Sequence, residues 1–270
     1  MKRGLWLLFS MLFVTLLTAC GGEKKQEQVI TKVAKKADYI VAVEPNYAPL
    51  ALRDAQGLPT GFDVEIMQAI AKDQKFTIEV VSDDFANLWQ KMQLGQYDVV
   101  IGGVGASEER RAFASFSNPV LKDRLALVVR KDSHINSFEE AQGKRFSVQN
   151  HTNLKRSLEE NPIAGKIITE ASPYLALTHV IDNNADALLV DASVAEGLVK
   201  DKPNLKVVLI PDSVYGVDER GVSATLEFAI SKQKPELVDK INIGLQHIRS
   251  EGTYDEIYRK WLGDNLWLKP

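Results

Sequence analysis

The residue types best suited to chemistry in this sequence lie in a glycine-rich turn that fits anion binding. Residues 99–101 form a short apolar run, which predicts a buried parallel strand. Three glycines follow, and two of them, Gly103 and Gly105, leave backbone N–H groups open to a ligand. Ser107 then predicts a helix N-cap, with Arg110 at the third helical position. A carboxylate or phosphate fits such a turn, although the same glycines equally serve tight strand–helix packing beside a solvated arginine.

Several kinds of chemistry are disfavoured by the same sequence. The turn lacks the Gly-Lys-Ser/Thr ending of a nucleotide P-loop, which argues against phosphate transfer. The four histidines have no metal-ligand spacing and no Ser/His/Asp or Cys/His set is evident, so we expect neither a metal nor a cofactor. With 33 Lys and Arg against 36 Asp and Glu, the net charge of −3 provides no basic footprint for nucleic acid.

Two further candidates stand where predicted strands end. Residues 39–43 predict a strand that runs into Glu44 and a proline-rich loop containing Tyr47. Residues 187–190 predict another buried strand, which ends at Asp191. Ligands of open α/β sheets bind at the carboxyl ends of strands, which is where the proline-rich loop lies. Asp191 is also well placed to cap the helix predicted after it, and both roles can hold together.

Alternating strand and helix patterns position these residues and indicate an α/β fold with a core, since 45% of the 270 residues are hydrophobic. Helices are predicted near residues 62–71, 84–95, 137–143, 174–181, 192–199, 235–249 and 252–263, and further strands at 76–81, 125–129, 146–148, 167–168 and 227–231. Tyr174 and Ile181 share one helix face, and Ile257 and Trp261 are expected to be buried in the last helix. Similar segments at 95–101 and 184–189 fit two lobes of similar topology.

The first residues predict export and a lipid anchor. Lys2 and Arg3 precede an apolar run at 5–17 that is too short to span a bilayer comfortably. Residues 17–20, Leu-Thr-Ala-Cys, then match the lipobox of bacterial lipoproteins. We therefore expect a signal peptide at 1–19, lipidation of Cys20 with palmitate, and a flexible tether at 20–37. A plain signal peptide with an incidental cysteine is the alternative.

Four segments together resemble one protein family. Residues 103–110 and 116–119 are similar to the "T-x-E-R … F-S-x-P" signature of family 3 extracellular solute-binding proteins, the amino-acid receptors of ABC importers. Residues 61–64 also match, and residues 252–263 are similar to the family's "G-x-Y-x-x-I-x-x-K-W-x-G" ending. The resemblance covers about residues 38–264.

This resemblance implies a two-lobed, type II periplasmic-binding-protein-like α/β fold. Its mixed sheets are joined by two crossing hinge strands, expected here near 121–123 and 223–227. Lobe 1 is then discontinuous, formed by residues 38–122 and 227–270. Residues 123–226 form lobe 2.

The resemblance also implies a function and a set of site residues. The protein is expected to bind an amino acid between its lobes as a monomer and to present it to an ABC permease, anchored in the bacterial cell envelope and facing the periplasm or the outside. Arg110 and the backbone at 103–105 would hold the α-carboxylate, and Asp191 the α-ammonium. Glu44 would meet a cationic side chain, which favours lysine, arginine or histidine over a neutral ligand. The remaining expected ligand-binding residues are Tyr47, Phe85 and Thr152.

Some residues depart from the family pattern and leave alternatives open. Gly105 replaces the usual Thr or Ser, and residues 150–152, Asn-His-Thr, replace the usual Gly-Thr-Thr. A titratable His151 near the cleft is thereby introduced. An enzyme on the same scaffold, similar to cyclohexadienyl dehydratase, would have His151 and Glu44 as its acid or base. A sensor or adhesin without transport is the third alternative.

Overall fold

The computed structural model describes residues 36–160, 163–211 and 225–264. The predicted signal peptide, Cys20 and most of the predicted tether therefore lie outside the described residues, as does the start of the predicted second crossing at Ser223. The strands are β1 Tyr39–Val43, β2 Leu52–Arg53, β3 Pro59–Thr60, β4 Ile78–Ser82, β5 Val99–Ile101, β6 Ala114–Phe116, β7 Leu121–Lys122, β8 Leu125–Arg130, β9 Arg145–Gln149, β10 Lys166–Glu170, β11 Ala187–Asp191, β12 Leu205–Leu209, β13 Thr225–Leu226 and β14 Ala229–Ser231. The helices are α1 Phe62–Asp73, α2 Phe85–Gln93, α3 Glu108–Arg111, α4 Asn153–Glu160, α5 Pro173–Ile181, α6 Ala192–Val199, α7 Pro235–Ser250 and α8 Thr253–Leu262, with a 3₁₀ turn at Glu139–Ala141.

The first sheet has the order β4-β1-β5-β14-β6. β1 pairs parallel with β4 and β5, whereas β14 pairs antiparallel with β5 and β6. Val99 and Ile101 pack in one hydrophobic cluster and Val100 in another, as alternation along a strand requires. A strand that is buried on both faces explains why residues 99–101 read as a continuous apolar run.

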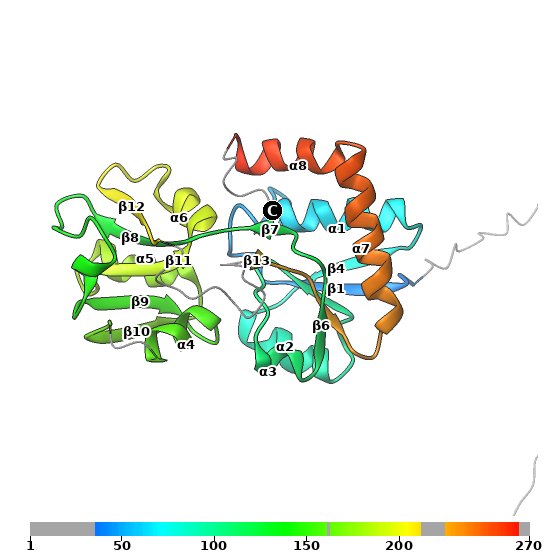
Figure 1. Cartoon of the computed structure of the whole chain (residues 1–270), viewed down its shortest axis with the longest axis horizontal. Coiled ribbons are helices and arrows are strands. Elements are labelled where there is room, and N and C mark those ends of the chain that lie inside the picture. The colour runs from blue at the N-terminus through cyan, green and yellow to red at the C-terminus, as the bar shows by residue number, and fades with distance from the viewer. Residues whose placement is uncertain (1–35, 161–162, 212–224, 265–270) are drawn as a thin grey trace, which may run out of the picture. The chain divides into compact units, whose positions relative to one another are not determined.

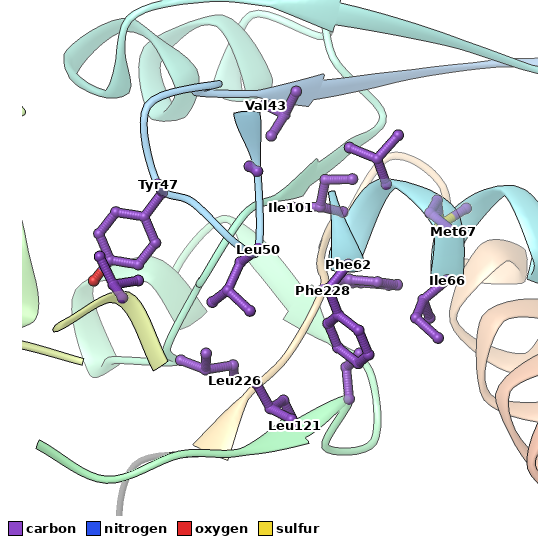
Figure 2. Packing of buried hydrophobic residues seen from close by; sticks show 14 of the residues in the cluster. Val43, Tyr47, Leu50, Phe62, Ile66, Met67, Ile101, Leu121, Leu226 and Phe228 are labelled. Atoms are coloured by element: carbon purple, nitrogen blue, oxygen red, sulfur yellow. The ribbon is translucent and has the colours of Figure 1, made fainter. Parts of the chain in front are cut away.

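Helices cover both faces of this first sheet (Figure 1). α1, α7 and α8 pack together on the side of Val99 and Ile101, and α2 packs on the side of Val100. Gly244 lets α7 approach α1 closely, because a Cβ there would lie 2.9 Å from Ile70 Cγ2. Figure 2 shows part of the hydrophobic cluster that includes the buried face of α1, with Tyr47 on the opposite side from Met67 in this view.

The second sheet has the order β10-β9-β11-β8-β12. β9 pairs parallel with β10 and β11, while β8 pairs antiparallel with β11 and β12. Leu188 and Val190 pack with α5 and α6, and Leu189 packs with Phe146 and Leu158 on the other face. Both sheets are therefore mixed and buried on both faces by helices, as an α/β fold requires.

A short antiparallel ladder connects segments that border the two sheets. Thr225 of β13 pairs with Lys122 of β7, and Leu226 pairs with Leu121. β7 leads from β6 of the first sheet into β8 of the second, and β13 leads into β14 of the first sheet. These strands lie where the two crossings are predicted, and the lobe boundaries assigned to them stay a prediction.

The buried face of α8 differs from expectation, and α5 shows which of its residues are covered. In α8 the fully buried residues are Tyr254, Tyr258 and Leu262, while Ile257 and Trp261 are only partly buried beside them. In α5 the buried residues are Pro173, Ala176, Leu177 and Val180, whereas Tyr174 and Ile181 are exposed. The difference in α8 arises because a tyrosine or tryptophan ring fits a buried face or a partly wet one.

Candidate functional site

Tyr47 connects the carboxyl ends of strands from different sheets. Its hydroxyl donates a hydrogen bond of 2.5 Å to Asp191 Oδ2, at the end of β11, and Tyr47 itself follows β1. Both side chains are buried. Burial raises the pKa of Asp191, and the hydrogen bond from Tyr47 opposes that rise. Asp191 is thus a desolvated acid with a donor on one oxygen, a suitable partner for an ammonium group.

Glu44 is a second buried acid in the loop after β1, with 5% of its surface exposed. Gln149, the last residue of β9, donates from Nε2 to Glu44 Oε2 at 2.7 Å and to the Ala171 carbonyl at 3.0 Å. Desolvation raises the pKa of Glu44 to about 7, against the opposing hydrogen bond from Gln149. A cation brought beside this carboxylate would keep it ionised.

Arg110 is a buried cation that hydrogen-bonds carbonyl oxygens. Ser107 caps α3 as expected by accepting the Arg110 N–H at 3.3 Å. The Arg110 guanidinium donates to the Gly105 carbonyl at 2.7 Å and to the His151 carbonyl at 3.4 Å. No ion pair found within the described ranges includes Arg110, and desolvation lowers its pKa to about 9, so it stays charged at neutral pH.

Aromatic rings hold this guanidinium in place. The Arg110 Cζ lies 4.1 Å from the Trp89 ring centroid and 5.6 Å from that of Phe85. Phe85 and Trp89 meet edge to face with centroids 6.0 Å apart, and both come from α2. Phe85 therefore lies beside the predicted carboxylate-binding arginine. Trp89, which shares its helix face at a spacing of four, was not predicted in the site.

The glycine turn has a different role at Gly103 from the expected one. The N–H groups of Gly102 and Gly103 each donate to Asp63 Oδ2 at 2.9 Å, so the Gly103 donor is already engaged. Its φ is +73°, and a Cβ there would lie 2.6 Å from the Tyr47 ring. Gly103 is thus needed to seat Tyr47. Burial raises the pKa of Asp63 to about 6, while these two N–H groups lower it.

Thr152 and His151 occupy the loop between β9 and α4. The Thr152 hydroxyl donates to the Gln149 carbonyl at 2.8 Å and accepts the Lys155 N–H at 3.1 Å, so it caps α4. His151 adopts the left-handed region with φ +60°, and its side chain is exposed. Its contribution to Arg110 is its carbonyl oxygen.

The structure pairs several of the predicted residues: Tyr47 contacts Asp191 and closely approaches Gly103, and Arg110 contacts Phe85. Glu44 accepts a hydrogen bond from Gln149. Gln149, the partner of Glu44, was not predicted, because the pairing of segments far apart in the chain decides its position. A separate hollow of about 660 Å³, lined by residues such as Arg130, Ile181 and Lys202, includes none of the predicted site residues. Among the described residues, no cluster of His, Cys, Asp and Glu is placed to hold a metal ion, and no helix has the length and apolar character to cross a membrane.

The sequence profile of the bacterial extracellular solute-binding proteins, family 3, matches residues 39–264. The chain belongs to this family. Two relatives of this solute-binding protein are an arginine-binding periplasmic protein of Mannheimia haemolytica, 29% identical over 233 residues that cover 86% of this chain and 94% of the relative, and the arginine-binding extracellular protein ArtP of Bacillus subtilis (strain 168), 28% identical over 263 residues that cover 97% and 98%.

Solved structures place this solute-binding protein in the two-lobed, type II fold. An ancestral arginine-binding protein bound to glutamine superimposes with a TM-score of 0.74 at 29% identity, over 84% of this chain and 98% of that one. An ancestral amino-acid-binding protein described as a precursor of cyclohexadienyl dehydratase gives a TM-score of 0.71 at 30% identity, over 83% of this chain and 95% of that one. The expected fold class is confirmed.

Proposed function

We propose that this solute-binding protein captures a cationic amino acid between its two lobes and delivers it to the permease of an ABC importer. The receptor role for amino acids follows from the family and from relatives that include arginine-, histidine- and glutamine-binding proteins of ABC transporters. The cationic class of the ligand is the new element of the proposal.

The charges of the buried side chains are the observation that carries this proposal. A cationic amino acid presents one carboxylate and two positive groups. Of the side chains proposed to contact the ligand, Arg110 is a buried guanidinium, and Glu44 and Asp191 are buried carboxyl groups. Each buried charge is costly without a partner, so a ligand with the complementary charges would be favoured. A neutral amino acid would leave Glu44 without a cation.

The proposed geometry assigns one ligand group to each residue. Arg110 binds the α-carboxylate, Asp191 with Tyr47 beside it binds the α-ammonium, and Glu44 binds the side-chain cation. The Gly105 N–H group and Thr152 remain proposed contacts to the ligand.

The same proposal covers the protein's place in the cell. Lipidation of Cys20 would hold the chain at the bacterial cell envelope, and residues 21–36 would act as its tether. The folded part would then work as a monomer facing the periplasm or the outside. The ligand would be released unchanged, as the family's role as receptors of importers implies.

A thermal-shift screen of the full chain tests the ligand class. L-arginine, L-lysine, L-ornithine and L-histidine are compared with L-glutamine, L-glutamate and putrescine. A ligand at about 100 times its Kd stabilises the folded state by about 2.7 kcal/mol. For a chain of this size that corresponds to a rise in Tm of roughly 5–11 °C.

The outcomes separate the alternatives. A Tm rise with the cationic amino acids but not with putrescine supports the proposal, because putrescine has no carboxylate for Arg110. A rise with L-glutamine alone would overturn the cationic assignment. Appearance of a new product after incubation, detected by mass spectrometry, would favour the enzyme alternative.

A further inference from the structure

Asp123 is a fully buried acid beside Asp191 that the proposed ligand contacts leave unused. It follows β7 directly, where the chain enters the second sheet. Its Oδ1 accepts the Arg124 N–H at 2.7 Å and the Ser193 N–H at 3.3 Å. Its Oδ2 accepts the Ser193 hydroxyl at 2.5 Å. Asp123 therefore binds the first turn of α6.

Asp191 occupies the N-cap position of α6 without acting as the cap. An aspartate at that position normally accepts the N–H of the second or third helical residue. Here Asp191 makes no such bond, and its carboxylate receives the Tyr47 hydroxyl instead. The N–H of Ser193, the second helical residue, is taken by Asp123. Both Asp123 and Asp191 therefore lie at the N-terminus of α6. Asp123, which is farther away in sequence, accepts the N–H group of the first turn.

We propose that Asp123 is a positioning residue, which caps α6 in place of Asp191 and so leaves the Asp191 carboxylate directed at the ligand's α-ammonium. The inference rests on the proposed function of Asp191. Without Asp123, the Ser193 N–H becomes an unsatisfied donor, and Asp191 is the nearest acceptor in sequence. Asp191 then has to give up a cap before it can bind the ammonium.

Electrostatics is consistent with this division of roles. Burial and repulsion by Asp191 both raise the pKa of Asp123, and the Ser193 hydroxyl and N–H lower it. The N-terminus of α6 carries the positive end of the helix dipole, which favours acids at this point. To cap α6, residue 123 needs a hydrogen-bond acceptor on a side chain of the length of aspartate. The negative charge of that side chain is less important for the cap.

The test compares two ligands that differ only in the α-ammonium group. L-arginine and 5-guanidinopentanoate are titrated by calorimetry into the full chain and into Asp123→Asn, Asp123→Ala and Asp123→Glu. Asparagine caps as well as aspartate, whereas alanine and glutamate cap poorly. The preference for L-arginine should therefore persist in D123N. In D123A and D123E the ratio of the affinities for L-arginine and 5-guanidinopentanoate should fall about 2- to 30-fold. This factor corresponds to the usual stabilisation by an N-cap hydrogen bond.

A double-mutant cycle separates positioning from general damage. In an Asp191→Asn background the ammonium contact is already lost, so D123A should not weaken L-arginine binding further. An equal loss in both backgrounds would show that Asp123 is merely structural. If D123A fails to fold, D123E carries the same comparison, because it keeps the charge and changes only the reach.

A ligand-free crystal structure of D123A or D123E gives a readout that is independent of affinity. The Asp191 carboxylate should then accept the Ser193 or Val194 N–H. An Asp191 side chain that leaves those groups alone overturns the inference, whatever the protein binds. If the unmodified chain binds neither arginine nor its desamino analogue, the cationic function fails while this structural test still stands.

Discussion

Replacing Glu44 by glutamine tests the proposed cation contact most directly. Glutamine keeps the size of the side chain and an acceptor for the Gln149 amide, which donates at 2.7 Å, but removes the charge. Removing one partner of a buried, hydrogen-bonded charge pair costs about 2–5 kcal/mol. At pH 8 the affinity of E44Q for L-arginine should therefore fall by about 30-fold or more.

The affinity for a cationic ligand should also depend on pH through the titration of Glu44. A pKa of about 7 leaves Glu44 mostly ionised at pH 8 and mostly protonated at pH 5 in the ligand-free protein. A cationic ligand has to displace that proton at pH 5, so its affinity should fall by about 100-fold between pH 8 and pH 5. In E44Q this part of the loss disappears, and only a smaller loss from Asp191 remains.

Isothermal titration calorimetry at pH 5, 6, 7 and 8 measures both effects. Repeating the titrations in buffers with different ionisation enthalpies also gives the number of protons released on binding. That number should be smaller for E44Q than for wild type. L-glutamine, which has no side-chain cation, serves as the matched ligand for both proteins. Equal pH profiles for wild type and E44Q would refute the reasoning, because Glu44 would then not face the ligand's cation.

Stability of the ligand-free protein should change in the opposite direction. The folded-state pKa of Glu44 is raised, so between pH 4.5 and about 7 the folded protein holds a proton that the unfolded chain has released. The free energy of unfolding therefore decreases as pH rises through that window, by up to about 3 kcal/mol. E44Q lacks this loss and should be more stable than wild type at pH 8, as measured by urea unfolding. Weaker binding combined with higher stability would exclude misfolding as the cause.

Three further predictions concern other residues. Arg110→Ala should abolish measurable binding of L-arginine while the far-UV circular dichroism is unchanged, and Arg110→Lys should restore it only partly, since lysine lacks the bidentate fork; full affinity in R110A would show that the carboxylate binds elsewhere. Asp63→Ala should lower the free energy of unfolding by about 1–3 kcal/mol for each N–H of Gly102 and Gly103 left unsatisfied, with Asp63→Asn closer to wild type in the same urea titration. Cys20→Ser should move the protein from the membrane fraction to the soluble fraction of cells, and an unchanged distribution would argue against a lipid anchor.

Much of the fold is determined by local sequence. The apolar run at Val99–Ile101 predicted a strand buried on both faces, and Ser107 predicted a helix cap. Both predictions could be made from residues that are neighbours in sequence. Strand and helix periods placed β1, α1, α2 and β11 within a residue or two of their observed ends. Arg110 could be singled out for the same reason, whereas the family resemblance supplied the expected roles of Glu44 and Asp191.

Contacts between distant segments were decided only by the tertiary structure. The partners of Glu44 and Asp191, namely Gln149 and Tyr47, are 105 and 144 residues away, and no local pattern specifies such pairs. The sequence predicts a ligand donor at Gly103, whereas in the structure its N–H group donates to Asp63 and its backbone packs against Tyr47. The capping of α6 by Asp123 rather than Asp191 likewise depends on which of two acids reaches the helix start. The sequence alone therefore determined which groups are charged and where the strands end, while folding determined which buried charge faces which partner, because desolvation and hydrogen bonding act across the whole core.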